Sequence, residues 1–430
     1  QHFMLVDNFT VLENVILGSE GGALISQSLA NARIELTRLA KEYGLEVELD
    51  IAVEELSVGM QQRVEILKGL YKGARVLILD EPTGVLTPQE SDELFRIFDA
   101  LKKQGVTIIL ITHKLREIMN ITDHVSVMRA GKMVAHRETS KTNPEELAEL
   151  MIGRKVLLNI EKSKAKSGKA LLTAKNLEIY NEQGLKRVTE VSFEAHSGEI
   201  LGIAGVTGNG QGSLLKALAG ILPLSKGSIE IMGKTITPET HLNPKQLREL
   251  GVAHVPEDRQ KMGMIADFSA SETALLGYHN DKEINQGVWL KRSSVKANCE
   301  SLMQAFDVRP NNPNLMSSNF SGGNQQKLIL AREFERDPEV LIIGQPTRGV
   351  DIGAIEFIRK RIIEMRDAGK AIILISVELE EIMSLSDRII VMCDGEITGT
   401  VDAKDANEAT LGMMMANALQ PQDEPKGAKL

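Results

Sequence analysis

The sequence predicts an α/β fold that occurs twice, with each copy built on a mostly parallel sheet. The stretch Leu56–Thr83 recurs as Phe320–Thr347 at a constant offset of 264 residues, and the register holds without a gap to Gly131 and Gly395. Short apolar runs alternate with amphipathic helical patterns in both copies, which is typical of parallel sheets covered by helices. A repeat this long indicates a duplicated domain, because solenoid units span only ~20–50 residues.

Length and composition are those of a globular protein of two or three domains. The chain has 430 residues, of which 42% are hydrophobic and 25% are charged. A net charge of −9 argues against general nucleic-acid binding. Two cysteines, Cys299 and Cys393, argue against a disulfide framework and fit a reducing cytosol. No apolar run approaches the ~18 residues of a membrane span, so a membrane role would come through partner subunits.

Residues 1–55 of the first copy show mostly helical patterns. The continuously apolar run Val76–Leu79 predicts a strand buried on both faces of a parallel sheet. Thr87–Glu90 reads as a capping box with proline at the first helical position. Gly105 ends the predicted helix, and Val106–Thr112 is a second buried strand. The apolar face of the helix carries Leu94, Ile97, Phe98 and Leu101.

The domain boundaries follow from the repeat. We expect a first domain over residues 1–153, a Lys/Ser-rich linker over 154–169, a second domain over 170–418 and a polar tail over 419–430. Leu171–Pro256 has no counterpart in the first copy, so we expect the first domain to be truncated at its N-terminus. The absent segment should carry the phosphate loop of that domain, and the chain alone should therefore lack measurable hydrolysis.

Acidic and imidazole side chains follow the two predicted strands of the first copy. Asp80 and Glu81 come after Val76–Leu79, and His113 follows the next strand. At a strand's carboxyl end, Asp80 can hold Mg²⁺, Glu81 can orient or deprotonate water, and His113 can donate to a γ-phosphate. Taken singly, the acidic pair also fits a solvated strand end and the histidine a structural role.

A glycine-rich loop, Gly205–Gly212, follows a predicted strand in the second copy and precedes a helix. It resembles the phosphate loop GxxxxGK[ST], but Gln211 stands at the lysine position and Gly212 at the Ser/Thr position, with Ser213 one residue late. A plain glycine-rich turn is an alternative. This copy has also lost its other polar groups, since Gly344, Gln345 and Val377 replace Asp, Glu and His. We expect a site that does not hydrolyse nucleotide.

A second glycine-rich motif, Ser321-Gly322-Gly323, precedes a helix that should begin near Asn324. Glycines allow close approach to phosphate, and a helix N-terminus offers free N–H groups; a simple Ser cap is the alternative. The first copy has Val58 at the middle position, where a Cβ hinders such approach.

The segments LSVGMQQR, LILDEPT, ITHK, FSGGNQQK and QPTRGVD together resemble the ATP-binding cassette (ABC) superfamily of P-loop NTPases. The double layout resembles ATPase subunits of bacterial carbohydrate importers, and GNGQ, HVPEDR and QPTRGVDIGAIEFI resemble the nucleoside-importer branch with basic-membrane-protein receptors. The resemblance implies two tandem ABC ATPase domains, each with a parallel sheet core and a helical subdomain. It covers nearly the whole chain.

The resemblance also implies that each ATP lies between one copy's phosphate loop and the other copy's signature motif. One site would then join Gln1, Asp80, Glu81 and His113 to the signature and to Asp351, with Asp80 and Gln1 near Mg²⁺. The other would join the degraded loop to Val58 and Thr87. Tyr180 could stack on adenine or pack in the core. The nucleotide-binding residues would be Gln1, Asp80, Gly205, Gly208, Gly210, Gln211, Ser213, Ser321, Gly322, Gly323, Gln325 and Asp351.

We therefore interpret the sequence as the ATPase subunit of a bacterial importer for nucleosides or simple sugars, with ATP and Mg²⁺ as cofactors. The resemblance implies transmembrane permease subunits, an extracytoplasmic receptor as an indirect partner, no nucleic acid, and a peripheral location at the cytoplasmic membrane face. A soluble twin-cassette ATPase of the translation-factor kind is the alternative, with Arg154–Lys169 as its basic arm. The replacement of both carboxylates by Gly344 and Gln345 argues against it.

Overall fold

The computed structural model describes residues 4–18, 25–56, 58–83, 86, 88–129, 131–155, 162–206, 208–281, 284–286 and 289–415. Gln1, Ser57, Thr87 and the tail 419–430 lie outside these ranges, as does the side chain of Val58. The chain forms two compact units, Gln1–Val156 and Leu157–Leu430.

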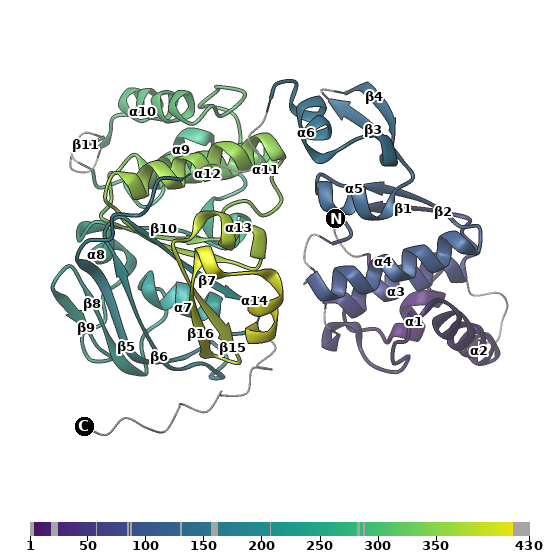
Figure 1. The fold of residues 1–430 in the computed structure, drawn as a ribbon. Helices are drawn as coiled ribbons and strands as arrows, with labels where there is room; N and C mark the ends of the chain where they lie inside the picture. The colour runs from purple at the N-terminus through teal and green to yellow at the C-terminus, as the bar shows by residue number, and fades with distance from the viewer. Residues whose placement is uncertain are drawn as a thin grey trace. The chain divides into compact units, whose positions relative to one another are not determined.

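Unit 1 combines helices with two small sheets (Figure 1). Strands β1 and β2 pair in parallel, with Val76 opposite Thr107 and Asp80 opposite Ile111, and β3 and β4 form an antiparallel hairpin. In chain order the elements are α1 (Val11–Ile16), α2 (Ile25–Tyr43), η1 (Val53–Glu55), α3 (Val58–Tyr71), β1 (Val76–Asp80), α4 (Pro88–Lys103), β2 (Thr107–Ile111), α5 (Leu115–Ile121), β3 (His124–Arg129), β4 (Lys132–Glu138), η2 (Thr139–Lys141) and α6 (Pro144–Ile152).

The expectation that the first strands are buried on both faces is wrong for unit 1. Leu77 is buried in a cluster with α3 and α4, but Ile78 is 66% exposed. On β2, Ile109 and Ile111 are 47% and 52% exposed. The reason is that α3 and α4 cover one face of the β1–β2 pair, and no described element of unit 1 covers the other.

Helix α4 matches its predicted range and its predicted apolar face. Pro88 opens the helix, and Gly105 follows it with a left-handed φ of 86°. The side chains predicted to face the core are all buried, since an amphipathic helix places residues three and four apart on one stripe. These residues are Leu94, Ile97, Phe98 and Leu101.

Unit 2 holds a six-stranded sheet in the order β10-β13-β14-β7-β15-β16 and an antiparallel sheet in the order β6-β5-β8-β9 (Figure 1). The elements are β5 (Ala170–Tyr180), β6 (Lys186–His196), β7 (Glu199–Gly205), α7 (Gln211–Leu218), β8 (Lys226–Ile231), β9 (Lys234–Ile236), α8 (Pro244–Glu249), β10 (Val252–Val255), the π-helix η3 (Arg259–Gly263), α9 (Ala270–Leu275), β11 (Asn285–Gln286), β12 (Trp289–Leu290), α10 (Arg292–Ala305), η4 (Ser317–Asn319), α11 (Gly322–Phe334), β13 (Val340–Gly344), α12 (Ile352–Asp367), β14 (Ala371–Ser376), α13 (Leu379–Leu385), β15 (Arg388–Cys393), β16 (Glu396–Asp402), η5 (Ala403–Asp405) and α14 (Glu408–Met415).

The six-stranded sheet of unit 2 is parallel except for β16, which pairs antiparallel with β15. Both faces are buried. One face packs with α9–α14 around residues such as Leu341 and Ile372. The other packs with α7 and the antiparallel sheet around Ile342 and Ile373. Every residue of β13 and β14 is buried, unlike their equivalents β1 and β2 in unit 1.

The duplication extends to local capping. Thr10 and Glu13 form a capping box at α1, and Ser269 and Glu272 form the same box at α9. Most later elements of unit 1 recur in unit 2 at the offset of 264, including β1 as β13 and α4 as α12. The two units therefore share one scaffold from α1 and α9 onward.

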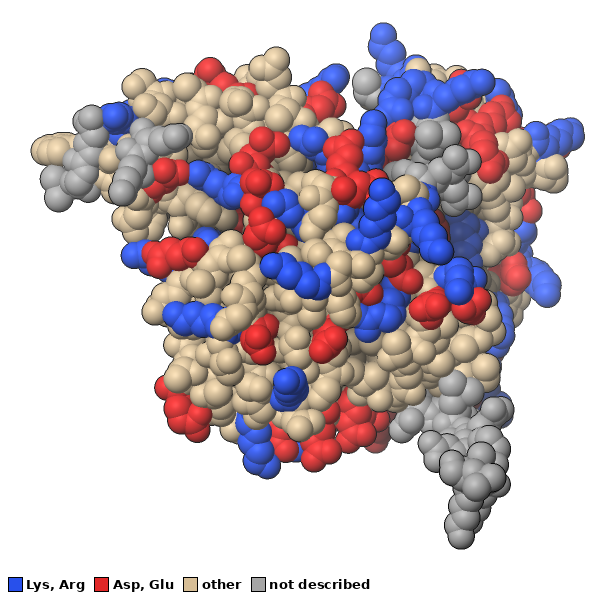
Figure 2. All heavy atoms as spheres, turned by 60° about the vertical axis from the view of Figure 1, so that its left-hand side comes forward, with Lys and Arg blue, Asp and Glu red and all other residues tan. Residues whose placement is uncertain are grey.

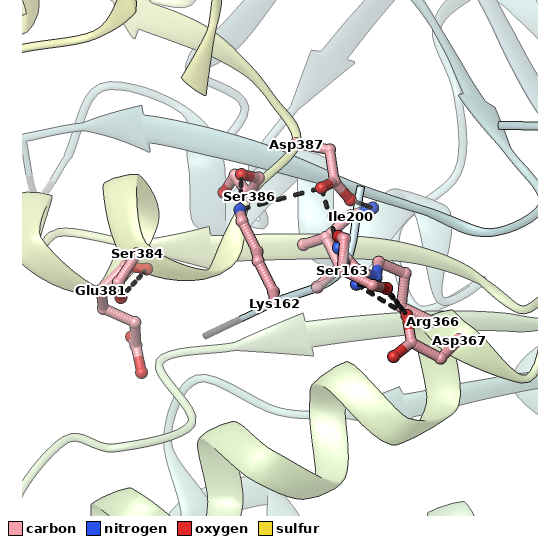
Figure 3. A network of polar contacts seen from close by, with 9 residues as sticks. All are labelled: Lys162, Ser163, Ile200, Arg366, Asp367, Glu381, Ser384, Ser386 and Asp387. Atoms are coloured by element: carbon pink, nitrogen blue, oxygen red, sulfur yellow. Dashed lines mark hydrogen bonds and ion pairs between the residues drawn. The ribbon is translucent and has the colours of Figure 1, made fainter. Parts of the chain in front are cut away.

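The second half of the predicted linker is docked on unit 2 (Figure 3). Lys162 donates to the backbone oxygen of Ser386 and lies 3.8 Å from Asp387. The fully buried guanidinium of Arg366 donates to the Ser163 carbonyl at 3.0 Å and to Asp387 at 3.0 Å. Asp387 also accepts from the Ile200 amide at 2.9 Å, so the linker end is fixed at the amino-terminal edge of β7.

Charged side chains of both signs are scattered over the face drawn in Figure 2. On the face drawn in Figure 2, Lys and Arg side chains lie between Asp and Glu side chains without a large region of one sign. No helix among the described residues is long and apolar enough to cross a membrane.

Candidate functional site

Glu81 and His113 meet at the carboxyl edge of the β1–β2 pair. The parallel register places Asp80 opposite Ile111, so the residues after both strands emerge together. His113 Nδ1 lies 2.8 Å from Glu81 Oε1, and both side chains are about three-quarters buried or more. The structure thus brings together the two residues predicted to be catalytic.

The backbone at Glu81 holds a left-handed conformation with φ of 46°. This conformation is costly for a residue with a Cβ and persists only where neighbours fix it. Here the Glu81 amide donates to the Ile111 carbonyl at 2.8 Å. Just after it, Thr83 is buried, its hydroxyl donates to Glu117, and its carbonyl accepts from Lys114 Nζ at 3.3 Å.

Asp80 is the last residue of β1, and its side chain is exposed at the same edge. A free carboxylate fits magnesium, which usually takes one or two protein carboxylates together with substrate phosphates and water. The described residues contain no group of three or more Asp, Glu, His or Cys side chains that could hold a metal ion by themselves. Asp80 therefore fits a metal that arrives with nucleotide.

The equivalent edge of unit 2 has the same backbone conformation but lacks the acidic and imidazole side chains. Gln345 has φ of 48°, and its amide donates to the Ile375 carbonyl at 2.8 Å, as at Glu81. Its side-chain Oε1 accepts from the Val377 amide at 3.4 Å instead of meeting an imidazole. A Cβ on Gly344 would lie 2.5 Å from Leu215 and 3.0 Å from the Glu257 amide, so packing leaves no room for an aspartate.

The residue that supports the loop after Gln345 is the buried Glu381, the equivalent of Glu117. Thr347 donates to its Oε1 at 2.7 Å. Burial raises the pKa of Glu381, and the nearby Arg359 opposes that shift. The support of the loop is therefore retained in both copies even though Glu81 has been replaced in the second.

The glycine-rich loop of unit 2 connects β7 to α7, as predicted. Gly208 and Gly210 have φ of 97° and 98°, and a Cβ on Gly210 would collide with the Arg187 carbonyl. Gln211, the first residue of α7, is 6% exposed, and its Nε2 has no hydrogen-bond partner among the described residues. Ser213 is half-buried two residues further along.

Tyr180 ends β5 and is 41% exposed, which argues against the alternative that it packs in the core. Its pairing partner Lys186 precedes Arg187, whose carbonyl lies beside Gly210. Tyr180 therefore remains available to a ligand at the loop.

Ser321, Gly322 and Gly323 open α11 and lie against the loop before α12. Ser321 Oγ accepts from Asn324 Nδ2 at 2.9 Å. A Cβ on Gly322 would lie 2.6 Å from Arg259 Nη2, and one on Gly323 would lie 3.1 Å from Asp351 Oδ2. Asp351 caps α12 by accepting from the Ala354 amide at 2.9 Å. These glycines therefore serve internal packing as well as any ligand.

Gln325 does not face open space. It is buried, and its amide donates to the carbonyls of Ser317 and Phe320 at 3.1 Å each. Gln61 makes the equivalent bonds to Val53 and Leu56 at 3.2 and 3.3 Å. Gln325 therefore braces the start of α11, and its contact with nucleotide stays a prediction.

Arg259 ends the segment HVPEDR, for which the sequence predicted no individual role. Its guanidinium donates to the carbonyls of Arg348 at 2.6 Å and Gly349 at 3.3 Å, and so ties η3 to the loop before α12. The π-helix η3 has no counterpart among the described residues of unit 1. A π-turn is rare and often marks a functional position.

Known proteins resemble most of the chain. The family model described as ABC transporter matches residues 1–84 and 188–348. The nucleoside import ATP-binding protein NupA of Lactococcus lactis subsp. cremoris is 45% identical over 96% of this chain and 81% of its own length. The guanosine import ATP-binding protein NupO of Bacillus subtilis is 44% identical over 98% of this chain and 82% of its length. The ribose import ATP-binding protein RbsA of Clostridium tetani is 36% identical over 95% and 79%.

Proposed function

The chain belongs to the ABC transporter family, and on that premise we propose that Glu81 and His113 perform the hydrolysis that drives a nucleoside importer. It is an ATP-binding import subunit, an ATPase coupled to transport. These relatives give no support to the alternative of a soluble translation-factor-like ATPase. The observation that carries the proposal is the 2.8 Å contact between His113 Nδ1 and Glu81 Oε1.

Glu81 is the general base in this proposal. An ionised carboxylate only accepts hydrogen bonds, so His113 Nδ1 must carry the proton of their contact. The contact fixes one carboxylate oxygen and leaves the other for a water molecule. If His113 also donates from Nε2 to a γ-phosphate, its ring must be the doubly protonated imidazolium, because a neutral ring donates from one nitrogen only.

Asp80 is the residue of the described part that would hold Mg²⁺, and Gln1 is a second predicted contact outside it. Bound there with nucleotide, magnesium would neutralise charge that develops on the phosphates. In unit 2, Gly344 stands at the position of Asp80 and carries no side-chain ligand atom.

We propose that hydrolysis is confined to the site containing Glu81. Unit 2 has the same backbone at Gln345, but an amide cannot take a proton from water, and Val377 offers no imidazole. The arrangement of each nucleotide between one copy's phosphate loop and the other copy's signature stays a prediction of the family resemblance.

The relatives support a proposal for the substrate class, the partners and the location. NupA and NupO, named for nucleoside and guanosine import, are 45% and 44% identical, whereas the ribose relative is 36% identical. We therefore propose nucleosides as the cargo, transmembrane permeases as direct partners, an extracytoplasmic receptor as an indirect one, and a peripheral position at the cytoplasmic face of the membrane.

Reconstitution of the importer in vesicles tests this function. With a full-length version of this subunit, ATP hydrolysis by the assembled complex should rise when guanosine or adenosine is supplied with the receptor. Ribose at the same concentration should leave the rate unchanged. Stimulation by ribose alone would overturn the cargo assignment. Unchanged hydrolysis with every cargo would contradict coupling to import.

A further inference from the structure

Thr83, two residues after Glu81, is held at both of its polar groups by residues that follow His113. Its buried hydroxyl donates to the carboxylate of Glu117, which is also buried. Its carbonyl accepts from Lys114 Nζ at 3.3 Å. The start of α5 therefore contacts the loop after β1 at two points, and these two contacts are termed the Thr83 clamp.

The Thr83 clamp connects the two loops that carry the catalytic pair. Lys114 is the residue directly after His113, and the Glu117 amide donates to the Lys114 carbonyl at 3.1 Å. The first turn of α5 thus fixes both side chains of the clamp relative to the imidazole. The left-handed backbone of Glu81 also needs neighbours that hold it in place. Any shift of Thr83 away from α5 would therefore lengthen the 2.8 Å contact between Glu81 and His113.

Unit 2 retains the hydroxyl contact of the clamp and has lost the lysine. Thr347 Oγ1 donates to the buried Glu381 carboxylate at 2.7 Å, as in the first copy. Glu378 stands at the position of Lys114, and an ionised carboxylate cannot donate to a carbonyl. The hydroxyl contact is therefore common to both copies, whereas the lysine occurs only in the copy that has the catalytic pair.

We propose that Lys114 and Glu117 are positioning residues for ATP hydrolysis. Through the Thr83 clamp they hold the Glu81 carboxylate at hydrogen-bonding distance from the imidazole of His113. The inference rests on the proposed function, because it takes Glu81 as the general base. A misplacement of about 1 Å can lower a rate by ~10²-fold, so loss of one clamp contact should lower kcat and leave ATP binding nearly intact.

Steady-state ATP hydrolysis by the importer, assembled with a full-length version of this subunit, tests the inference. K114M removes the donor and keeps an unbranched side chain. It should lower kcat by about tenfold or more, while KM for ATP stays within a factor of about three. K114R should recover most of the rate, because a guanidinium also donates to a carbonyl. E117L should behave as K114M does, whereas E117Q should keep most of the rate because its amide oxygen still accepts from the Thr83 hydroxyl.

Two comparisons separate positioning from a purely structural role. In unit 2, E381L removes the same hydroxyl contact and should destabilise the chain as E117L does, but it should leave kcat within a factor of about two. In the E81Q background, K114M should lower the residual rate by less than a factor of about two. The reason is that a residue that acts through the general base has little further effect once that base is gone.

Three results would overturn the inference: an unchanged kcat in K114M, equal losses of kcat in E117L and E381L, or the same loss in K114M with and without E81Q. The proposed function fails in a different way. An E81Q rate equal to that of the unsubstituted importer would refute Glu81 as the base, and an importer that no nucleoside stimulates would refute the coupling. A low E81Q rate together with a normal K114M rate would refute the clamp alone.

Discussion

The β1–β2 edge of unit 1 and the β13–β14 edge of unit 2 have the same backbone and different chemistry. Glu81 and Gln345 adopt φ of 46° and 48°, and both amides donate to the neighbouring strand at 2.8 Å. Glu81 then meets His113, whereas Gln345 meets only a backbone amide. The left-handed conformation is present in unit 2 although the carboxylate is not. Strand pairing and packing therefore maintain this conformation, and it does not depend on the catalytic group.

The sheets of the two units also differ in how far their strands are buried. The strands of unit 2, which lost the catalytic groups, are buried on both faces, whereas unit 1 keeps those groups beside strands with one exposed face. Burial of the sheet and retention of its chemistry are therefore independent properties of this scaffold. Substitutions at equivalent positions of the two units can measure the effect of burial separately from that of the catalytic groups.

The largest stability difference is expected at an ion pair that both units share. Arg366 and Asp387 form a buried pair, and the equivalent Lys102 and Asp123 form an exposed pair at 2.6 Å. Removing one partner of a buried pair leaves an uncompensated charge and costs about 3–5 kcal/mol. An exposed pair contributes under about 1 kcal/mol.

Chemical denaturation followed by circular dichroism should therefore show R366A strongly destabilised and K102A nearly unchanged. R366A also removes the donor to Ser163, so the linker end should become accessible to protease in that variant alone. Equal losses in the two variants would contradict the difference in burial.

A smaller difference is expected on the exposed sheet face. Ile342 in β13 is fully buried and its equivalent Ile78 in β1 is 66% exposed. I342V should cost about 0.5–1.5 kcal/mol because it deletes a buried methylene, whereas I78V should change stability by less than about 0.5 kcal/mol. Differential scanning calorimetry of the two variants provides the measurement. A comparable loss in I78V would show that this face is covered in solution.

The helices and strand positions could be predicted from the sequence because periodicity and capping act locally. The range and buried face of α4 followed from Pro88, Gly105 and the spacing of its apolar residues. The burial of β1 could not be predicted, because an apolar run shows that a strand can be covered and not what covers it. Long-range packing decides that.

Some features of the candidate site could likewise be predicted from the sequence, and others could not. The meeting of Glu81 and His113 could be predicted, since parallel strands end at one edge. The direction of the Gln325 amide could not be predicted. The sequence motif shows where Gln325 lies on α11, but its hydrogen-bond partners are backbone carbonyls of the turn before that helix.

The confinement of ATP hydrolysis to the Glu81 edge is tested most directly by the paired substitutions E81Q and Q345N. The measurement is the steady-state rate of ATP hydrolysis by the importer assembled with a full-length version of this subunit, in which the first copy has its phosphate loop. E81Q should lower the rate by ~10²–10⁴, because it removes a positioned general base. Q345N keeps a residue that tolerates the left-handed backbone and should stay within a factor of about three, since it removes no acid–base group. Equal losses in the two variants would contradict a single hydrolytic edge.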